Sequence, residues 1–91
     1  MHVEWLQKAL DELTVIWTNA SSSERPMINA AADRIDRDLA KDPLAVGESR
    51  DEGNRIHFVF PLGVIYRIES ATNVAVGHVW RFRKGQVPGK K

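Results

Sequence analysis

Residues 55–83, RIHFVFPLGVIYRIESATNVAVGHVWRFR, decide the fold of this chain. They form three runs rich in β-branched and aromatic residues, separated by turn residues at 61–63 and 70–73. Strands joined by turns this short are antiparallel, because a parallel return needs a crossover of a dozen or more residues. The stretch therefore predicts a three-stranded antiparallel meander.

The residues before the meander predict one strand and two helices. Residues 2–6 alternate polar and apolar, as a short strand does. Two amphipathic patterns follow; Ser22 or Ser23 can cap the second, which ends at Asp42-Pro43. The apolar stripe of the first pattern comprises Leu6, Leu10, Leu13, Trp17 and Ala20, and that of the second Ile28, Ala31, Ile35 and Leu39.

The order of elements is therefore β-α-α-β-β-β. It predicts an α+β two-layer fold in which two N-terminal helices pack on one face of a small antiparallel sheet. We expect a single domain over residues 1–84, followed by a flexible basic tail over residues 85–91.

Composition narrows the class of protein. The 91 residues include no cysteine, which excludes a disulfide framework and a thiolate zinc site. The three histidines are scattered, so we expect no metal site and no cofactor. No apolar run has the length of a membrane span, so we expect no membrane contact and a cytoplasmic location.

The charge is divided unevenly along the chain. The net charge of +1 is the balance of −4 over residues 1–49 and +5 over residues 50–91. Such polarity is typical of a chain whose second half binds an anionic partner such as a nucleic acid, and scattered solubilising charge explains the count equally well.

Counting with period two assigns the meander side chains to two faces. One face is expected to meet the helices; it carries Tyr66, and His78 there is expected to be a core histidine. The other is expected to be open to solvent, where a charged face is also the ordinary outcome for an antiparallel sheet. The predicted helix-facing set is Ile56, Phe58, Phe60, Val64, Tyr66, Val76, His78, Trp80 and Phe82, and the predicted open set is Arg55, His57, Arg67, Arg81 and Arg83 around Ala75 and Gly77.

The layout resembles the RelE/ParE superfamily of toxins from bacterial type II toxin–antitoxin modules. The resemblance covers nearly the whole chain and is carried mainly by the order and spacing of loose motifs. It implies a cognate antitoxin as partner. The matching segments are Val3-Glu4-Trp5, Ile35-Asp36-x-x-Leu39 followed by Asp42-Pro43, Gly47-Glu48-Ser49-Arg50, Arg55-Ile56-His57-Phe58, Val64-Ile65-Tyr66-Arg67-Ile68, and Val74 through Val79 ending at Arg81.

Ribonuclease members of this superfamily cut mRNA on the ribosome by driving a 2′-hydroxyl onto the neighbouring phosphate. The resemblance implies that His57 is the acid or base and that Arg55 and Arg81 hold the phosphate. Further contacts to RNA phosphates would come from Arg83, Arg67, Lys84 and Arg50.

Two departures leave alternatives open. Gly63 stands where many ribonuclease members carry an arginine, and the tail KGQVPGKK lacks their terminal tyrosine or histidine. The ParE branch shares the fold without that active site and poisons DNA gyrase, and a degenerate, inactive toxin is a further alternative. The resemblance favours mRNA cleavage over gyrase inhibition. A small RNA-binding module is disfavoured, because such sheets usually expose aromatic residues and here these are assigned to the core face.

Overall fold

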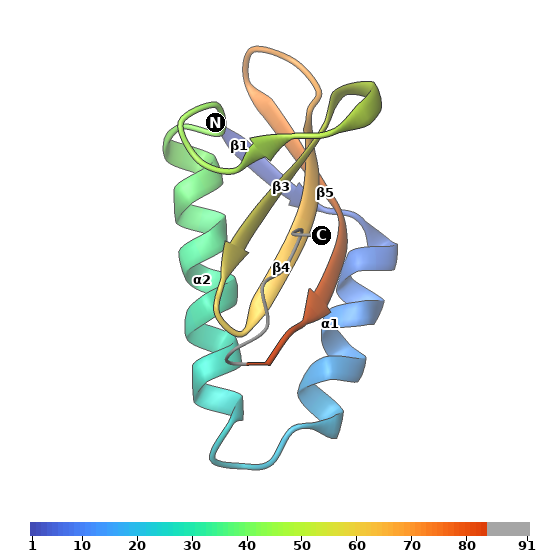
Figure 1. Cartoon of the computed structure of the whole chain (residues 1–91), viewed down its shortest axis with the longest axis vertical. Coiled ribbons are helices and arrows are strands. Elements are labelled where there is room, and N and C mark those ends of the chain that lie inside the picture. The colour runs from blue at the N-terminus through green and yellow to red at the C-terminus, as the bar shows by residue number, and fades with distance from the viewer. Residues whose placement is uncertain (84–91) are drawn as a thin grey trace.

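The computed structural model describes residues 1–83 and contains the predicted order of elements (Figure 1). Lys84 and the predicted tail, residues 85–91, lie outside the described residues. The α+β class and the two consecutive helices are confirmed. The elements are β1 (His2–Trp5), α1 (Gln7–Asn19), α2 (Arg25–Lys41), β2 (Glu48–Ser49), the short 3₁₀ helix η1 (Asp51–Gly53), β3 (Asn54–Val59), β4 (Leu62–Ile68) and β5 (Asn73–Arg81).

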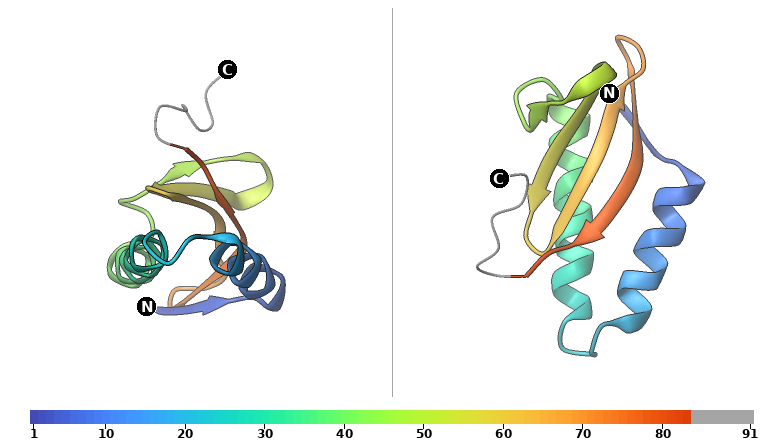
Figure 2. Two further views of the ribbon diagram at one scale, coloured as in Figure 1. Left: turned by 90° about the horizontal axis from the view of Figure 1, so that it is seen from below. Right: turned by 45° about the vertical axis from the view of Figure 1, so that its right-hand side comes forward.

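The strands form one sheet in the order β1-β5-β4-β3-β2. The antiparallel meander β3-β4-β5 is confirmed, and the two-residue strand β2 extends it at one edge. At the other edge β1 pairs with β5 in parallel, so the sheet is mixed, whereas the sequence predicts an antiparallel one. Helix α1 packs on β5 and helix α2 on β3, and both lie on the same side of the meander (Figure 2, left).

The stripe of helix α1 that faces the core differs from the stripe predicted from the sequence. Leu6, Leu10 and Trp17 are about 40% exposed, so their assignment to the core was wrong. Two apolar stripes run along this helix, and spacing alone could not decide between them. The stripe that faces the core comprises Ala9, Leu13, Ile16 and Ala20.

Helix α2 is preceded by a reciprocal pair of hydrogen bonds. The Glu24 N–H donates to Ser21 Oγ at 3.2 Å, and the Ser21 N–H donates to Glu24 Oε1 at 2.9 Å. This is the capping-box pattern. Its serine is Ser21, whereas the sequence predicts Ser22 or Ser23 in this place. The predicted core stripe of α2, from Ile28 to Leu39, is buried.

None of the helices within residues 1–83 is long and apolar enough to cross a membrane. The core lies between the helices and the sheet. Besides the stripes of both helices, it contains Leu62, Val64, Tyr66, Val74, Val76 and Val79.

Candidate functional site

Strand β3 turns Arg55 and His57 towards the helices. Arg55 lies opposite Tyr66, and His57 lies opposite Val64, on the neighbouring strand β4. Residues opposite each other in an antiparallel pair share a face, and both Tyr66 and Val64 are buried beneath the helices. The prediction that Arg55 and His57 lie on the open face was therefore wrong.

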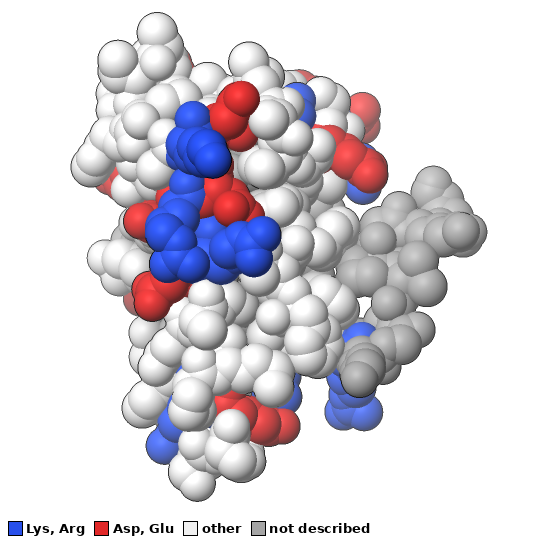
Figure 3. Space-filling model, turned by 90° about the vertical axis from the view of Figure 1, so that its left-hand side faces the viewer, with Lys and Arg blue, Asp and Glu red and all other residues white. Residues whose placement is uncertain are grey.

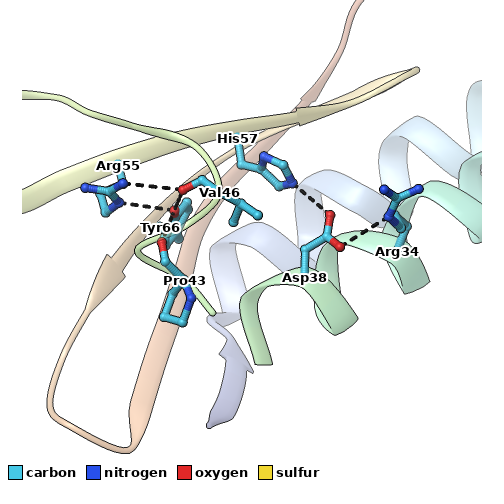
Figure 4. A network of polar contacts seen from close by, with 7 residues as sticks. All are labelled: Arg34, Asp38, Pro43, Val46, Arg55, His57 and Tyr66. Atoms are coloured by element: carbon cyan, nitrogen blue, oxygen red, sulfur yellow. Dashed lines mark hydrogen bonds and ion pairs between the residues drawn. The ribbon is translucent and has the colours of Figure 1, made fainter. Parts of the chain in front are cut away.

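Arg55 is held by four acceptors; Figure 4 shows two of them, the Tyr66 hydroxyl and the Val46 carbonyl. Its Nε donates to the Tyr66 hydroxyl at 3.2 Å, and its Nη1 donates to Ser49 Oγ at 2.9 Å. Its Nη2 lies 3.3 Å from the Leu44 carbonyl and 3.4 Å from the Val46 carbonyl. The guanidinium thus ties the segment between α2 and β2 to the sheet.

Tyr66 completes this tie. The side chain is 1% exposed, and its hydroxyl lies 2.7 Å from the Pro43 carbonyl and 2.8 Å from the Val46 carbonyl. A hydroxyl carries one proton, so it donates to one of these carbonyls at a time while accepting from Arg55. Buried polar groups need such partners, and within residues 1–83 no buried side-chain nitrogen or oxygen lacks one.

His57 joins the sheet to α2. Its Nε2 lies 3.0 Å from Asp38 Oδ2, and the other oxygen of Asp38 accepts from Arg34 at 3.2 Å (Figure 4). Desolvation tends to raise the pKa of Asp38, but the hydrogen bonds from His57 and Arg34 outweigh it and hold the pKa below its ordinary value. The carboxylate is therefore ionised at neutral pH and holds His57 in place.

A bulge in β5 exchanges the two faces of its second half. Tyr66 pairs with Val76, but the preceding residue, Ile65, pairs with His78, so Gly77 is left over. Beyond this point Val79 is 3% exposed and Trp80 lies over Gly63 on the open face. The assignment of Trp80 to the core face was wrong, and so was that of Phe82, which packs with the open-face ring of Phe58.

Arg81, at the end of β5, lies on the side of the helices opposite Leu62, not on the open face. Its Nη2 donates to Glu24 Oε2 at 2.8 Å. The hydrogen bond from Arg81, together with those from Ser21, lowers the pKa of Glu24 to about 2. The Arg81 side chain is 36% exposed and that of Glu24 42%, so the pair lies at the surface.

The structure does not gather Arg55, His57 and Arg81 around one point. The β4 partners of Arg55 and Arg81 are Tyr66 and Leu62, four residues apart. Four residues of strand span about 13 Å. Each of the three side chains also has a protein partner of its own.

The open face of the meander carries an aromatic patch, defined here as Phe58, Phe60, Trp80 and Phe82. The Phe58 ring packs edge-on against Trp80 at 6.0 Å between centroids and against Phe82 at 5.8 Å. Phe60, 44% exposed, packs on Phe82 at 5.5 Å. The assignment of these rings to the core face was the argument against an RNA-binding module, and their position on the open face removes it.

Gly63 lies beneath the patch. A Cβ atom at this position would lie 2.7 Å from Trp80 and 3.0 Å from Phe58. Such distances are far inside van der Waals contact. The position where many ribonuclease members of the resembled superfamily carry an arginine therefore has no space for a side chain.

The remaining predicted phosphate ligands are dispersed. Arg67 is on the open face, as expected, and donates to Asn54 Oδ1 at 3.2 Å beside a hollow of about 340 Å³ over Ala75 and Gly77. His78 lines the same hollow; it is 44% exposed with Nδ1 3.4 Å from Glu12, so its assignment to the core was wrong. Arg50 lies 3.2 Å from Glu48 near the opposite edge of the sheet, and Arg83 is exposed just beyond β5.

The side of the molecule formed by α2 is not uniformly basic. Lysine and arginine side chains gather there beside acidic ones (Figure 3), and Arg34 is paired with Asp38 at 3.2 Å. This side therefore does not present the unbroken positive surface that would attract a polyanion.

No protein-family model matches the sequence, and no curated protein matches it. Solved structures do. A chain of the chromosomal ParDE system from P. aeruginosa matches with a TM-score of 0.73 at 15% identity, over 91% of this chain and 97% of that one. A chain of the RelBE2 toxin–antitoxin complex from Mycobacterium tuberculosis matches with a TM-score of 0.68 at 26% identity, over 90% and 96%.

A chain of the intact RelBE complex from E. coli matches with a TM-score of 0.58 at 15% identity, over 91% of this chain and 98% of that one. All three matches span nearly the full length of both chains. The fold that the matches share with this chain is the one described above, two helices packed on a mixed, mainly antiparallel sheet. The chain has the RelE/ParE toxin fold.

Proposed function

We propose that this chain is the toxin of a type II toxin–antitoxin module and that it acts by binding a target protein rather than by cutting RNA. The similar solved structures come from toxin–antitoxin systems of both branches, which supports an antitoxin as its partner. The resemblance to the ParE branch suggests DNA gyrase as the target.

The observation that carries this proposal is the covered backbone of Gly63. Trp80 and Phe58 occupy the space that an arginine of a ribonuclease site would need. The open face offers aromatic rings instead, and aromatic side chains are enriched in the cores of protein interfaces.

The contacts of the predicted catalytic residues also support action by binding rather than by RNA cleavage. An acid or base must reach the proton that it transfers. His57, however, is 14% exposed and bound to Asp38 on the side of the helices. To act on RNA it would have to leave α2.

Ribosome-dependent mRNA cleavage is the second candidate. It is favoured by the 26% identity to a chain of the RelBE2 complex and by the exposure of Arg81. In that case His57 and Arg81 remain the residues expected to carry the chemistry.

Inducible expression in bacteria distinguishes the two candidates. We expect growth arrest with gyrase-linked DNA breaks and with unchanged mRNA 5′ ends. His57→Ala and Arg81→Ala should remain toxic wherever circular dichroism shows that they fold, whereas Phe60→Ala should lose toxicity. Cleaved mRNA that disappears in His57→Ala and Arg81→Ala would overturn the proposal in favour of the nuclease.

A further inference from the structure

The last part of β5 has a free edge. Strand β1 pairs with β5 only along residues 73–76, and the hydrogen bond from the Leu6 N–H to the Val76 carbonyl ends this pairing. Beyond Val76, within residues 1–83, no strand lies beside the edge of β5 that is turned away from β4 (Figure 2, right). Such an edge carries backbone donors and acceptors that can pair with another chain.

Val79 and Arg81 direct their backbone groups to this edge. The Phe82 N–H donates to the carbonyl of Pro61, the residue directly before β4. Alternate residues of an antiparallel strand point their N–H and C=O groups to opposite edges, so Val79 and Arg81 face outwards. The edge therefore has two donors and two acceptors in alternation.

A carboxylate of α1 covers one of these donors. Glu12 Oε1 accepts from the Val79 N–H at 3.0 Å, and Glu12 Oε2 lies 3.4 Å from His78 Nδ1. Charged side chains commonly block the pairing of exposed strand edges. The Glu12 side chain is 33% exposed, so it can turn away from β5 without opening the core.

A groove lies between α1 and this edge. Its volume is about 390 Å³, and it combines apolar side chains with two carboxylates and one guanidinium group. Val15 is 58% exposed, so the groove leaves apolar surface in water. Residues that line the groove are Asp11, Glu12, Val15, Ile16, Val79 and Arg81.

We propose that this edge binds the same edge of a second copy of this chain in antiparallel orientation, and that Glu12 controls the strength of the pairing. A two-fold axis at Trp80 places Val79 of one copy opposite Arg81 of the other. Each such pair exchanges two backbone hydrogen bonds once Glu12 releases the Val79 N–H. The proposal concerns self-association and does not rest on the proposed function.

Charge favours a second copy as the occupant. Val79 and Arg81 lie on the helix-facing side of β5, so the Arg81 side chain of the second copy enters the groove beside Asp11. Asp11 uses Oδ1 to accept from Gln7 at 2.9 Å, and its Oδ2 is available for the incoming guanidinium. Arg81 would leave Glu24 for this contact, and both side chains of that pair are more than a third exposed, where ion pairs contribute little.

Sedimentation equilibrium of the full chain tests the pairing. The paired edge is short, and stable interfaces bury about 1,200–2,000 Å², so the native chain should form a weak, reversible dimer. Glu12→Ala should tighten this dimer about ten-fold or more, because the change frees the Val79 N–H in both copies. A native chain that stays monomeric at every concentration would reduce Glu12 to a protecting group and overturn the proposal.

Asp11→Ala is the matched control, because it removes the same charge from the neighbouring residue of the groove. It leaves the bond between Glu12 and Val79 in place and takes away the acceptor for Arg81, so it should weaken the dimer. Opposite effects of the two changes would support the proposal. An equal gain in both variants would reduce the effect to net charge and overturn it, as would unchanged association in folded Glu12→Ala.

A single introduced cysteine identifies the paired edge. The chain contains no cysteine, so a disulfide formed by Trp80→Cys joins two copies. Residues that face each other in a non-hydrogen-bonded antiparallel pair have Cα atoms about 4.5 Å apart, which a disulfide can span. Under mild oxidation, Trp80→Cys should give a covalent dimer, and the addition of Glu12→Ala should accelerate its formation.

Ser22→Cys is the control for random collision, since Ser22 is exposed between α1 and α2. It should form the covalent dimer more slowly than Trp80→Cys, and equal rates would contradict pairing at β5. Thermal unfolding checks that each variant is folded. If Trp80→Cys fails to fold, the comparison of Glu12→Ala with Asp11→Ala carries the test.

Discussion

Arg55, His57 and Tyr66 show how side chains suited to catalysis can serve the architecture instead. Arg55 and Tyr66 bind the segment between α2 and β2 through its carbonyl groups. His57 binds Asp38 of α2. Polar groups on the core side of a sheet are tolerated when each has a partner. Basic residues on a strand therefore indicate hydrogen-bond donors, and these donors can bind other parts of the protein as well as a substrate.

Tyr66→Phe should destabilise the chain. It leaves the ring in the core but removes the hydroxyl that binds the Pro43 and Val46 carbonyls and accepts from Arg55. Unsatisfied buried partners cost about 1–3 kcal/mol, measured as the free energy of unfolding in urea. Thr14→Val removes an exposed hydroxyl bond within α1 and should change stability by less than about 0.5 kcal/mol. An equal effect of both changes would contradict the role given to Tyr66.

Acid should weaken the fold through Glu24. Its pKa is lowered from 4.5 to about 2 in the folded chain, so its contribution is complete above pH 4.5 and is lost as pH falls towards 2. The melting temperature of the native chain should therefore fall over this window more than that of Glu24→Gln. Glu4→Gln makes the same change at an exposed position on β1, and its melting temperature should fall as that of the native chain does. If the melting temperature of Glu24→Gln falls equally, Glu24 does not stabilise the fold.

At the scale of elements, the sequence contained the order of strands and helices but not the orientation of their faces. Short turns determined the antiparallel meander, and the stripe of α2 determined its buried side. Two causes reversed the faces elsewhere. In β3 the apolar face is the outer one, because Arg55 and His57 find partners inside. In β5 the bulge at Gly77 shifts the register by one residue.

The signals that could have located the site were weak. Gly77 within a strand is a common mark of a bulge, and Ser21 followed three residues later by Glu24 is a capping pattern. Neither indicates that the second oxygen of Glu24 meets Arg81, 57 residues further along. That contact depends on packing of α2 and β5, which no local pattern specifies.

Two glycines of the sheet provide a matched test of this arrangement. Gly63→Ala should destabilise the chain by about 1–3 kcal/mol, because its Cβ would collide with Trp80 and Phe58. Gly77→Ala adds the same methyl group where no atom lies within 4 Å, and should change stability by less than about 0.5 kcal/mol. Urea unfolding of both variants measures the difference. Equal stabilities would mean that Trp80 does not cover Gly63.

In the whole molecule, the two sides of the sheet have different roles. The helix-facing side holds the core together with the bonded side chains of Arg55 and His57, and the other side presents the aromatic patch. The uneven charge of the sequence does not translate into a basic catalytic face. Two basic groups of the second half, His57 and Arg81, are paired with acids of the first half, Asp38 and Glu24. What is left outside is an apolar surface with a charged rim.

Cleavage of ribosome-bound mRNA by the purified chain tests the central claim most directly. Programmed ribosomes are incubated with the chain, and new RNA 5′ ends are mapped by primer extension. We predict no ends beyond those in the buffer control, while the same preparation inhibits supercoiling by gyrase. New ends that appear with the native chain and vanish with folded His57→Ala would contradict the claim that the chain acts by binding alone.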